Sequence, residues 1–165
     1  MIEPLRFSFV VGCGVDHAFA TWTTRVSAWW QLDHTVSCEG GLQVVIEPGV
    51  GGRIFERTAS GREIEWGEIT AWEPPRRLRY LWHLRSDRAD ATEVEIVFTA
   101  LARASTRVDI EHRGWERFGA AGRARRDANQ SGWAGLLPVY VAACSVEPGA
   151  ARQSGIYSSK SEVKS

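Results

Sequence analysis

Few residues of this chain could carry acid–base chemistry, and His112 is the first of them. It ends a run in which Val108 and Ile110 alternate with charged residues, so it shares their parity and is expected to face inward near a pocket mouth. A neutral imidazole there could donate to a ligand carbonyl or act as a general base. A structural histidine with satisfied hydrogen bonds is the favoured alternative, because no second catalytic group lies at a fixed spacing from it.

Glu68 is the best partner for His112, although its side of the expected sheet is ambiguous. It lies in a long expected strand, 62–72, whose inward parity changes near Gly67. A change of parity within one strand indicates a bulge that curves the sheet. Glu68 is therefore either a pocket residue or a solvent-facing one.

Metal, phosphate and thiol chemistry are poorly supported. The four histidines show no two-ligand spacing on one element, and His83 shares the parity of two arginines and is expected to be exposed. The three cysteines lie far apart, which excludes a disulfide framework and favours a reduced, cytoplasmic chain. The glycine-rich stretch 49–52 lies in a hairpin and lacks the phosphate-loop pattern. We therefore expect no metal and no cofactor.

Large apolar side chains form the second group of candidates, and they favour binding over catalysis. By parity, five aromatic residues share one face of the expected sheet, and three residues of the last helix point back at them. The set is Phe55, Trp66, Tyr80, Trp82 and Phe98 on strands, with Trp133, Leu137 and Tyr140 on the helix. Such a set stacks a planar ligand or simply fills a core. Of the eight tryptophans, only Trp66, Trp82 and Trp133 are expected to line a common space.

The elements that must position these residues follow a simple order. A strand, 5–11, precedes two short helices, 16–22 with Asp16 as its cap and about 25–31, and a long helix spans about 128–145. Six strands joined by tight turns are expected between them, at 42–47, 53–57, 62–72, 77–85, 92–100 and 106–113. This order predicts an α+β fold in which a curved seven-stranded antiparallel sheet wraps the last helix and leaves a pocket between them.

Composition bounds the possible partners. One domain, residues 1–146, is expected, followed by a small polar tail, 147–165, that should be disordered. The 20 basic residues balance 20 acidic ones, so no overall field favours nucleic acid, and no apolar run is long enough for a membrane span. The basic stretch from Arg117 to Arg126 either meets an acidic ligand at the pocket mouth or, like most charge runs, is simply solvated.

Six segments then carry a resemblance by their order and spacing. They are Trp29-Trp30, Gly51–Glu56, Trp66–Ile69, Trp72–Leu78, Thr106–His112 and Gly132-Trp133. Together they resemble the family homologous to the activator of Hsp90 ATPase, within the START-like (Bet v 1-like, SRPBCC) helix-grip superfamily, over roughly residues 5–145. The resemblance implies a helix-grip fold with a hydrophobic cavity for a small molecule. Relatives include polyketide cyclases and aromatases, ligand binders and co-chaperone domains, so the fold alone implies no single activity.

Three hypotheses follow. The favoured one is binding of a small hydrophobic, aromatic molecule between the sheet and the last helix, at the apolar set above together with Glu68 and His112. The second is a polyketide cyclase-like or aromatase-like enzyme that uses His112 as acid and base. The third, which the resemblance implies, is an Hsp90-linked interaction domain. Because no catalytic set is complete, binding is favoured over catalysis, and the oligomeric state stays open between a monomer and a homodimer.

Overall fold

A single antiparallel sheet organises the chain, with its seven strands in the order β1-β7-β6-β5-β4-β3-β2. The computed structural model describes residues 1–146, so the expected disorder of 147–165 lies outside the described residues. The strands are β1 (Leu5–Val11), β2 (Gln43–Ile46), β3 (Arg53–Arg57), β4 (Glu63–Glu73), β5 (Arg77–Trp82), β6 (Thr92–Ala102) and β7 (Ser105–Arg113). Strands β2 to β7 are neighbours in sequence order and form a meander, whereas β1 pairs with β7.

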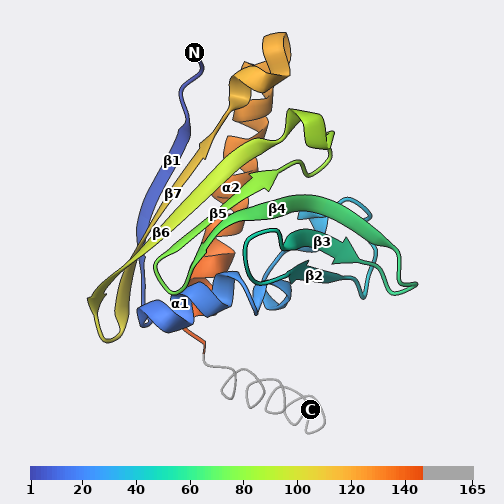
Figure 1. Cartoon of the computed structure of the whole chain (residues 1–165). Coiled ribbons are helices and arrows are strands. Elements are labelled where there is room, and N and C mark those ends of the chain that lie inside the picture. Colours follow the sequence, from blue (N-terminus) through green and yellow to red (C-terminus); the bar gives the residue numbers. More distant parts are fainter. Residues whose placement is uncertain (147–165) are drawn as a thin grey trace, which may run out of the picture.

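The helices complete a helix-grip arrangement. Helix α1 (Val15–Trp22) and the short 3-10 turns η1 (Val26–Ala28) and η2 (Leu32–His34) connect β1 to β2. Two further turns, η3 (Arg88–Asp90) and η4 (Trp115–Ala121), follow β5 and β7, and the long helix α2 (Gly122–Cys144) ends the described chain. Figure 1 shows the sheet curled along α2, with α1 near one end of that helix. The predicted α+β class and seven-stranded sheet are thus confirmed.

Alternation along the strands separates a dry face from a wet one. On β6, Val94, Ile96 and Phe98 are buried in the core that faces α2. Glu93 and Glu95 alternate with them on the outer face, where Arg113 of β7 forms ion pairs with both carboxylates and with Glu111 of β7. An antiparallel sheet with this pattern buries only one side, as the period of two requires.

The change of parity predicted within residues 62–72 is confirmed as a bulge in β4. The pairing of β3 with β4 passes from Ile54↔Gly67 to Phe55↔Glu65, so Trp66 is the extra residue. Gly67 is needed at this point because a Cβ there would lie 2.0 Å from the carbonyl oxygen of Leu81. The bulge bends β4, and such bending is what allows one sheet to curl along a single helix.

Three expected boundaries were wrong for identifiable reasons. Helix α1 begins at Val15 with Gly14 as its cap residue and no side-chain capping bond, so Asp16 is not the cap. Strand β5 ends at Trp82 because the chain turns there, and Arg85 takes a left-handed conformation with φ of 61°. Helix α2 starts at Gly122, about six residues before the predicted start at about 128. The prediction missed its first turns because they are polar and give no apolar periodicity.

Aromatic contacts join the two helices beneath the sheet. Tyr140 of α2 donates a hydrogen bond of 2.8 Å to the backbone oxygen of Ala18 in α1. Trp22 packs edge-on against Tyr140, with 4.7 Å between ring centroids, and stacks near Trp133 at 6.0 Å. Among residues 1–146, no helix combines the length and apolar character that a bilayer span requires.

Candidate ligand-binding pocket

The predicted apolar set divides when it is placed in the structure. Five of its members are core residues that contribute nothing to the wall of the pocket described below: Trp66, Tyr80, Phe98, Leu137 and Tyr140. Their burial in one continuous cluster fills the middle of the space where an internal cavity was expected. Two other members of the predicted set, Trp82 and Trp133, line that pocket.

Phe55 faces the opposite side of the sheet, which corrects its expected position. Its ring shares a parity with Arg53 and Arg57, whose guanidinium carbons lie 4.3 and 5.3 Å from the ring centroid. The inward position on β3 belongs instead to Glu56, which is fully buried. Strand parity predicted Phe55 on the inner face, but the two arginines cover its ring on the outer face, and Glu56 has buried hydrogen-bond partners on the inner one.

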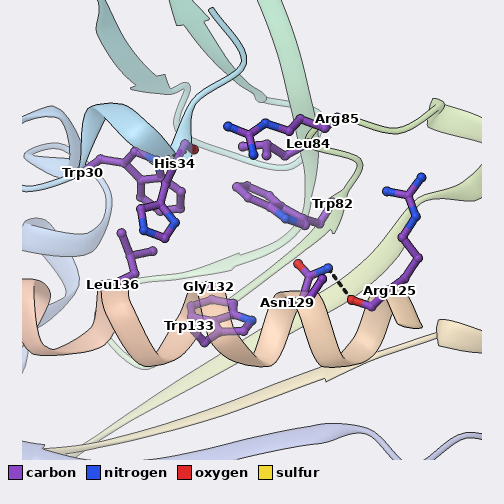
Figure 2. Close-up of a pocket in the computed structure, with 11 residues that line it drawn as sticks. Trp30, His34, Trp82, Leu84, Arg85, Arg125, Asn129, Gly132, Trp133 and Leu136 are labelled. Carbon is purple, nitrogen blue, oxygen red and sulfur yellow. Dashed lines mark hydrogen bonds between the residues drawn. The ribbon is translucent and has the colours of Figure 1, made fainter. Parts of the chain in front are cut away.

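The pocket lies at one end of the space between sheet and helix and has a volume of about 220 Å³. Its walls come from the first half of α2, the end of β5 with the turn after it, and the segment that contains η2. Figure 2 shows Trp82 and Arg85 across the pocket from α2, with Trp30 and His34 closing one side. Three segments far apart in sequence therefore build this site.

Tryptophans dominate the apolar wall. Trp30 and Trp82 are both half-buried, and their ring centroids lie 5.8 Å apart. Trp133 supplies the opposite side from α2, and Leu84 and Leu136 complete the apolar surface. Flat, rigid side chains on several sides favour a flat partner, because stacked and edge-on contacts both need aromatic faces.

His112 lies behind this wall and not on it. The indole N–H of Trp133 donates to His112 Nδ1 at 3.0 Å, and His112 Nε2 lies 2.7 Å from Thr92 Oγ1. Burial lowers the pKa of His112 to about 3, and its side chain is 0% exposed. The structure thus supports the alternative of a satisfied structural histidine, and it corrects the expected position at a pocket mouth.

Glu68 and His83 belong to a cluster on the outer face. Glu68 pairs in register with Arg53 and accepts a hydrogen bond of 2.5 Å from Arg88, so it is remote from the pocket wall. Nε2 of His83 lies 3.1 Å from Glu65, which Arg88 also contacts. His83 was expected to be exposed, but these neighbours cover it and leave it only 6% exposed.

Glu56 anchors the segment that closes one side of the pocket. Its carboxylate accepts hydrogen bonds from the amides of Val36 and Ser37 at 2.6 and 3.0 Å, from Ser37 Oγ at 2.5 Å, and from the Trp66 indole at 2.9 Å. Burial acts to raise the pKa of Glu56, but the hydrogen bonds outweigh it and hold the pKa below its ordinary value. The segment that follows Trp30 is therefore fixed by a buried carboxylate, which sequence parity could not reveal.

Polar groups occupy the rim of the pocket. They are His34, Arg85, Arg125 and Asn129. The His34 ring lies close to the helix where a Cβ on Gly132 or Gly135 would come within 4.0 or 3.7 Å of it. Of these rim residues, only Arg125 had a sequence signal, through the basic stretch. His34 and Arg85 lie in turns, and Asn129 lies in the polar first half of α2, so none of the three belongs to an apolar pattern.

The described residues give little support to metal chemistry. Within residues 1–146, no three His, Cys, Asp or Glu side chains gather as a metal site requires. The pocket itself contains one imidazole and no carboxylate. What it offers is aromatic surface, cationic hydrogen-bond donors and one amide, which together suit an organic ligand.

Solved structures of known proteins share this fold. A solved structure of an anthrahydroquinone-γ-pyrone synthase, Txn09, is 35% identical, covering 74% of this chain and 84% of that one, with a TM-score of 0.55. The resistance protein CalC from Micromonospora echinospora, described as self-sacrificing, is 24% identical over 86% of this chain and 94% of its own, with a TM-score of 0.63. Among curated proteins, none matches the chain.

Other similarity is to a chaperone partner and shows the fold alone. An Hsp90 activator from Plasmodium falciparum is 19% identical over 68% of this chain and 74% of its own, with a TM-score of 0.51.

The family model for activator of Hsp90 ATPase homolog 1-like proteins matches residues 14–138, which include most of the sheet and the pocket. The chain therefore belongs to the activator of Hsp90 ATPase homolog 1-like protein family.

Proposed function

We propose that this protein binds a small, planar, polycyclic aromatic molecule in the pocket between α2 and the turn after β5. The observation that carries the proposal is the wall of three tryptophans, Trp30, Trp82 and Trp133, contributed by three separate segments. The volume of about 220 Å³ is below the range of roughly 300–1,000 Å³ that is common for drug-sized ligands. A ligand of a few fused rings, or one end of a larger molecule, is therefore the best fit.

The chemical class is also supported by the similar synthase. That protein forms an anthrahydroquinone-γ-pyrone, a fused aromatic system, and it shares 35% identity with this chain. Because fused rings are flat and weakly polar on their faces, the tryptophan wall suits them, and the polar rim suits their oxygen substituents. The proposal concerns the class of ligand and assigns no individual compound.

The binding proposal is tested by titrating the protein with anthraquinone-2-carboxamide, an uncharged three-ring probe, and following tryptophan fluorescence. We expect saturable quenching in the wild type. Trp82→Leu should weaken the affinity by about fivefold, since one ring-stacking contact is worth about 1 kcal/mol. The matched control is Trp72→Leu, because Trp72 is also half-buried but packs against Phe19, away from the pocket.

Two results would overturn this proposal. One is the absence of saturable quenching in the folded wild type. The other is an equal affinity for the wild type and Trp82→Leu, with thermal melting showing that the variant is folded. An equal loss in Trp72→Leu would also count against it, because that loss would reflect a general loosening of the core.

A second candidate function is ring closure on such a ligand, which the identity to a synthase favours. His112 is poorly suited to act as acid or base, because both of its ring nitrogens have hydrogen-bond partners within the protein. His34 is the one histidine on the pocket wall, and its Nε2 lies 3.8 Å from Asp33 Oδ1. A base at His34 would take the proton from a ligand hydroxyl whose oxygen then attacks a carbonyl carbon; loss of water completes the ring.

Turnover is tested with an ortho-hydroxyaryl 1,3-diketone, which closes to a γ-pyrone with release of one water. The enzyme proposal expects closure faster than in buffer, and a loss of about 100-fold or more in His34→Gln with probe affinity kept. A rate equal to that in buffer, or a fully active His34→Gln, would reject it. The Hsp90-linked hypothesis has a separate test, which is capture of an Hsp90 homologue by the purified protein.

A further inference from the structure

We infer that the ligand of this pocket carries an acidic group, a carboxylate or an ionised phenol, and that Arg85 and Arg125 bind it at the rim. The inference rests on the proposed function, because it names a substituent on the aromatic molecule that the tryptophan wall would hold. Its support is the charge of the pocket lining, the hydrogen bonds that position the Arg85 guanidinium and the cation–π contact that positions that of Arg125.

The charge of the pocket is the first support. Its lining contains two arginines and no aspartate or glutamate. On the outer face of the sheet, by contrast, arginines such as Arg53, Arg77 and Arg113 each contact two or more carboxylates. Across residues 1–146, no ion pair involves Arg85 or Arg125. The rim therefore has two cations without an internal counter-ion.

Arg85 is held in place by backbone groups of the opposite segment. Its Nη2 donates to the carbonyl oxygens of Asp33 and Thr35, at 3.1 and 2.5 Å. These bonds occupy one end of the guanidinium and leave the Nε and Nη1 donors without a partner in the described part of the chain. A guanidinium that is already positioned loses less conformational entropy when it binds an anion.

Arg125 approaches the rim from the helix. Its guanidinium carbon lies 4.9 Å from the centroid of the Phe118 ring, and this cation–π contact limits its movement. Figure 2 shows its side chain extending from α2 on the side where Trp82 lies. Asn129 donates from Nδ2 to the backbone oxygen of Arg125 at 2.9 Å, so its Oδ1 remains an acceptor for a ligand hydroxyl.

The solvent exposure of the two arginines limits how much each contributes to the affinity for an anion. Both arginines are exposed, so each charge-assisted hydrogen bond is partly screened by water and salt. We expect each arginine to contribute severalfold to the affinity for an anion, and almost nothing to the affinity for a neutral ligand of the same shape. The signature of the site is therefore a preference between two matched ligands, and not a gain in affinity for every ligand.

The experiment compares anthraquinone-2-carboxylate with anthraquinone-2-carboxamide by fluorescence titration at about 50 mM salt, where screening is weak. The carboxylate should bind at least about tenfold more tightly to the wild type. Arg85→Gln and Arg125→Gln should each reduce this ratio severalfold. The matched control is Arg123→Gln, because Arg123 is exposed on the same helix but does not line the pocket.

The outcomes separate the two proposals. Equal affinity for the two probes would overturn the acidic-group inference and leave the proposed function intact. A ratio unchanged in both arginine variants, or reduced as much in Arg123→Gln, would also overturn it. Saturable binding of neither probe would instead overturn the proposed function. Arg85→Gln also removes the hydrogen bonds to the backbone oxygens of Asp33 and Thr35. A loosened segment would lower the affinity for both probes alike, so the ratio of the two affinities is the quantity to compare.

Discussion

The indole N–H of Trp133 and Nδ1 of His112 form a hydrogen bond of 3.0 Å that joins helix α2 to strand β7. An indole N–H can only donate, so Nδ1 must accept and the ring proton resides on Nε2. Nε2 then donates to Thr92 Oγ1 at 2.7 Å, and the Thr92 hydroxyl donates to the backbone oxygen of Trp82 at 3.3 Å. His112 thereby links the two tryptophans that face each other across the pocket.

This linkage predicts a pH-dependent stability. The pKa of His112 is about 3 in the folded protein and about 6.5 when unfolded, so between these values the unfolded chain binds a proton that the folded one does not. The free energy of unfolding should therefore fall as the pH drops below about 6.5, by about 2 kcal/mol between pH 7 and pH 5. Urea unfolding at several pH values measures this decrease in the free energy of unfolding. In His112→Gln this decrease should largely vanish; an equally steep decrease would contradict the assignment.

The buried carboxylate of Glu56 should be essential for the pocket segment. Glu56→Gln replaces one acceptor oxygen with a donor facing the amides of Val36 and Ser37, and should cost about 2–3 kcal/mol of unfolding free energy. Faster amide hydrogen exchange at Val36 and Ser37 would localise the effect. Glu63→Gln is the control, because that carboxylate is partly exposed and pairs with arginines, so its loss should lower the free energy of unfolding far less than Glu56→Gln does. Equal costs would refute the anchoring role.

Two helix glycines should separate stability from binding. An alanine at Gly132 or Gly135 meets nothing closer than the His34 ring, at 4.0 or 3.7 Å, and each change should stabilise the helix by about 0.5–1 kcal/mol. Only Gly132 lines the pocket. Gly132→Ala should therefore melt at a slightly higher temperature but bind anthraquinone-2-carboxamide severalfold more weakly, whereas Gly135→Ala should gain stability alone. Unchanged affinity in Gly132→Ala would exclude this face of α2 from ligand contact.

The bulge in β4 should tolerate no side chain at Gly67. A Cβ there would lie 2.0 Å from the Leu81 carbonyl oxygen, so the strands must separate and Gly67→Ala should destabilise by about 3 kcal/mol. Gly40→Ala provides the control, because a Cβ at that glycine meets nothing within 4 Å. The midpoints of denaturant unfolding are compared for the two variants and the wild type. A stable Gly67→Ala variant would show that this bulge can relax.

Much of the architecture was predictable because alternation and turn residues act locally. Burial of Val94, Ile96 and Phe98 in alternation with Glu93 and Glu95 follows from the period of two, and the bulge beside Gly67 appeared as a change of that period. Helix α2 was placed by its apolar stripe but not by its polar start at Gly122. Periodicity reports an element only where one of its faces is buried.

The aromatic character of the pocket was predictable from the sequence, but the identity of most residues that line it was not. Parity assigns a side chain to a face of the sheet, but it does not say whether another ring fills the space beside it. Trp66 was expected to line the common space, yet it is fully buried beside Trp30, and Trp30 reaches the pocket from a segment explained at first by the fold alone. Phe55 was expected on the inner face of β3, but Glu56 lies there instead, because its carboxylate has buried hydrogen-bond partners while arginines cover the Phe55 ring.

The sequence by itself therefore determined the sheet, the long helix and an aromatic-rich space between them, because those depend on local periodicity and composition. Only the tertiary structure decided which rings fill that space, that His112 is a structural link, and that Arg85 and Arg125 meet at one rim. Those outcomes depend on contacts between residues far apart in the chain. Such contacts arise from packing, and no spacing along the sequence encodes them.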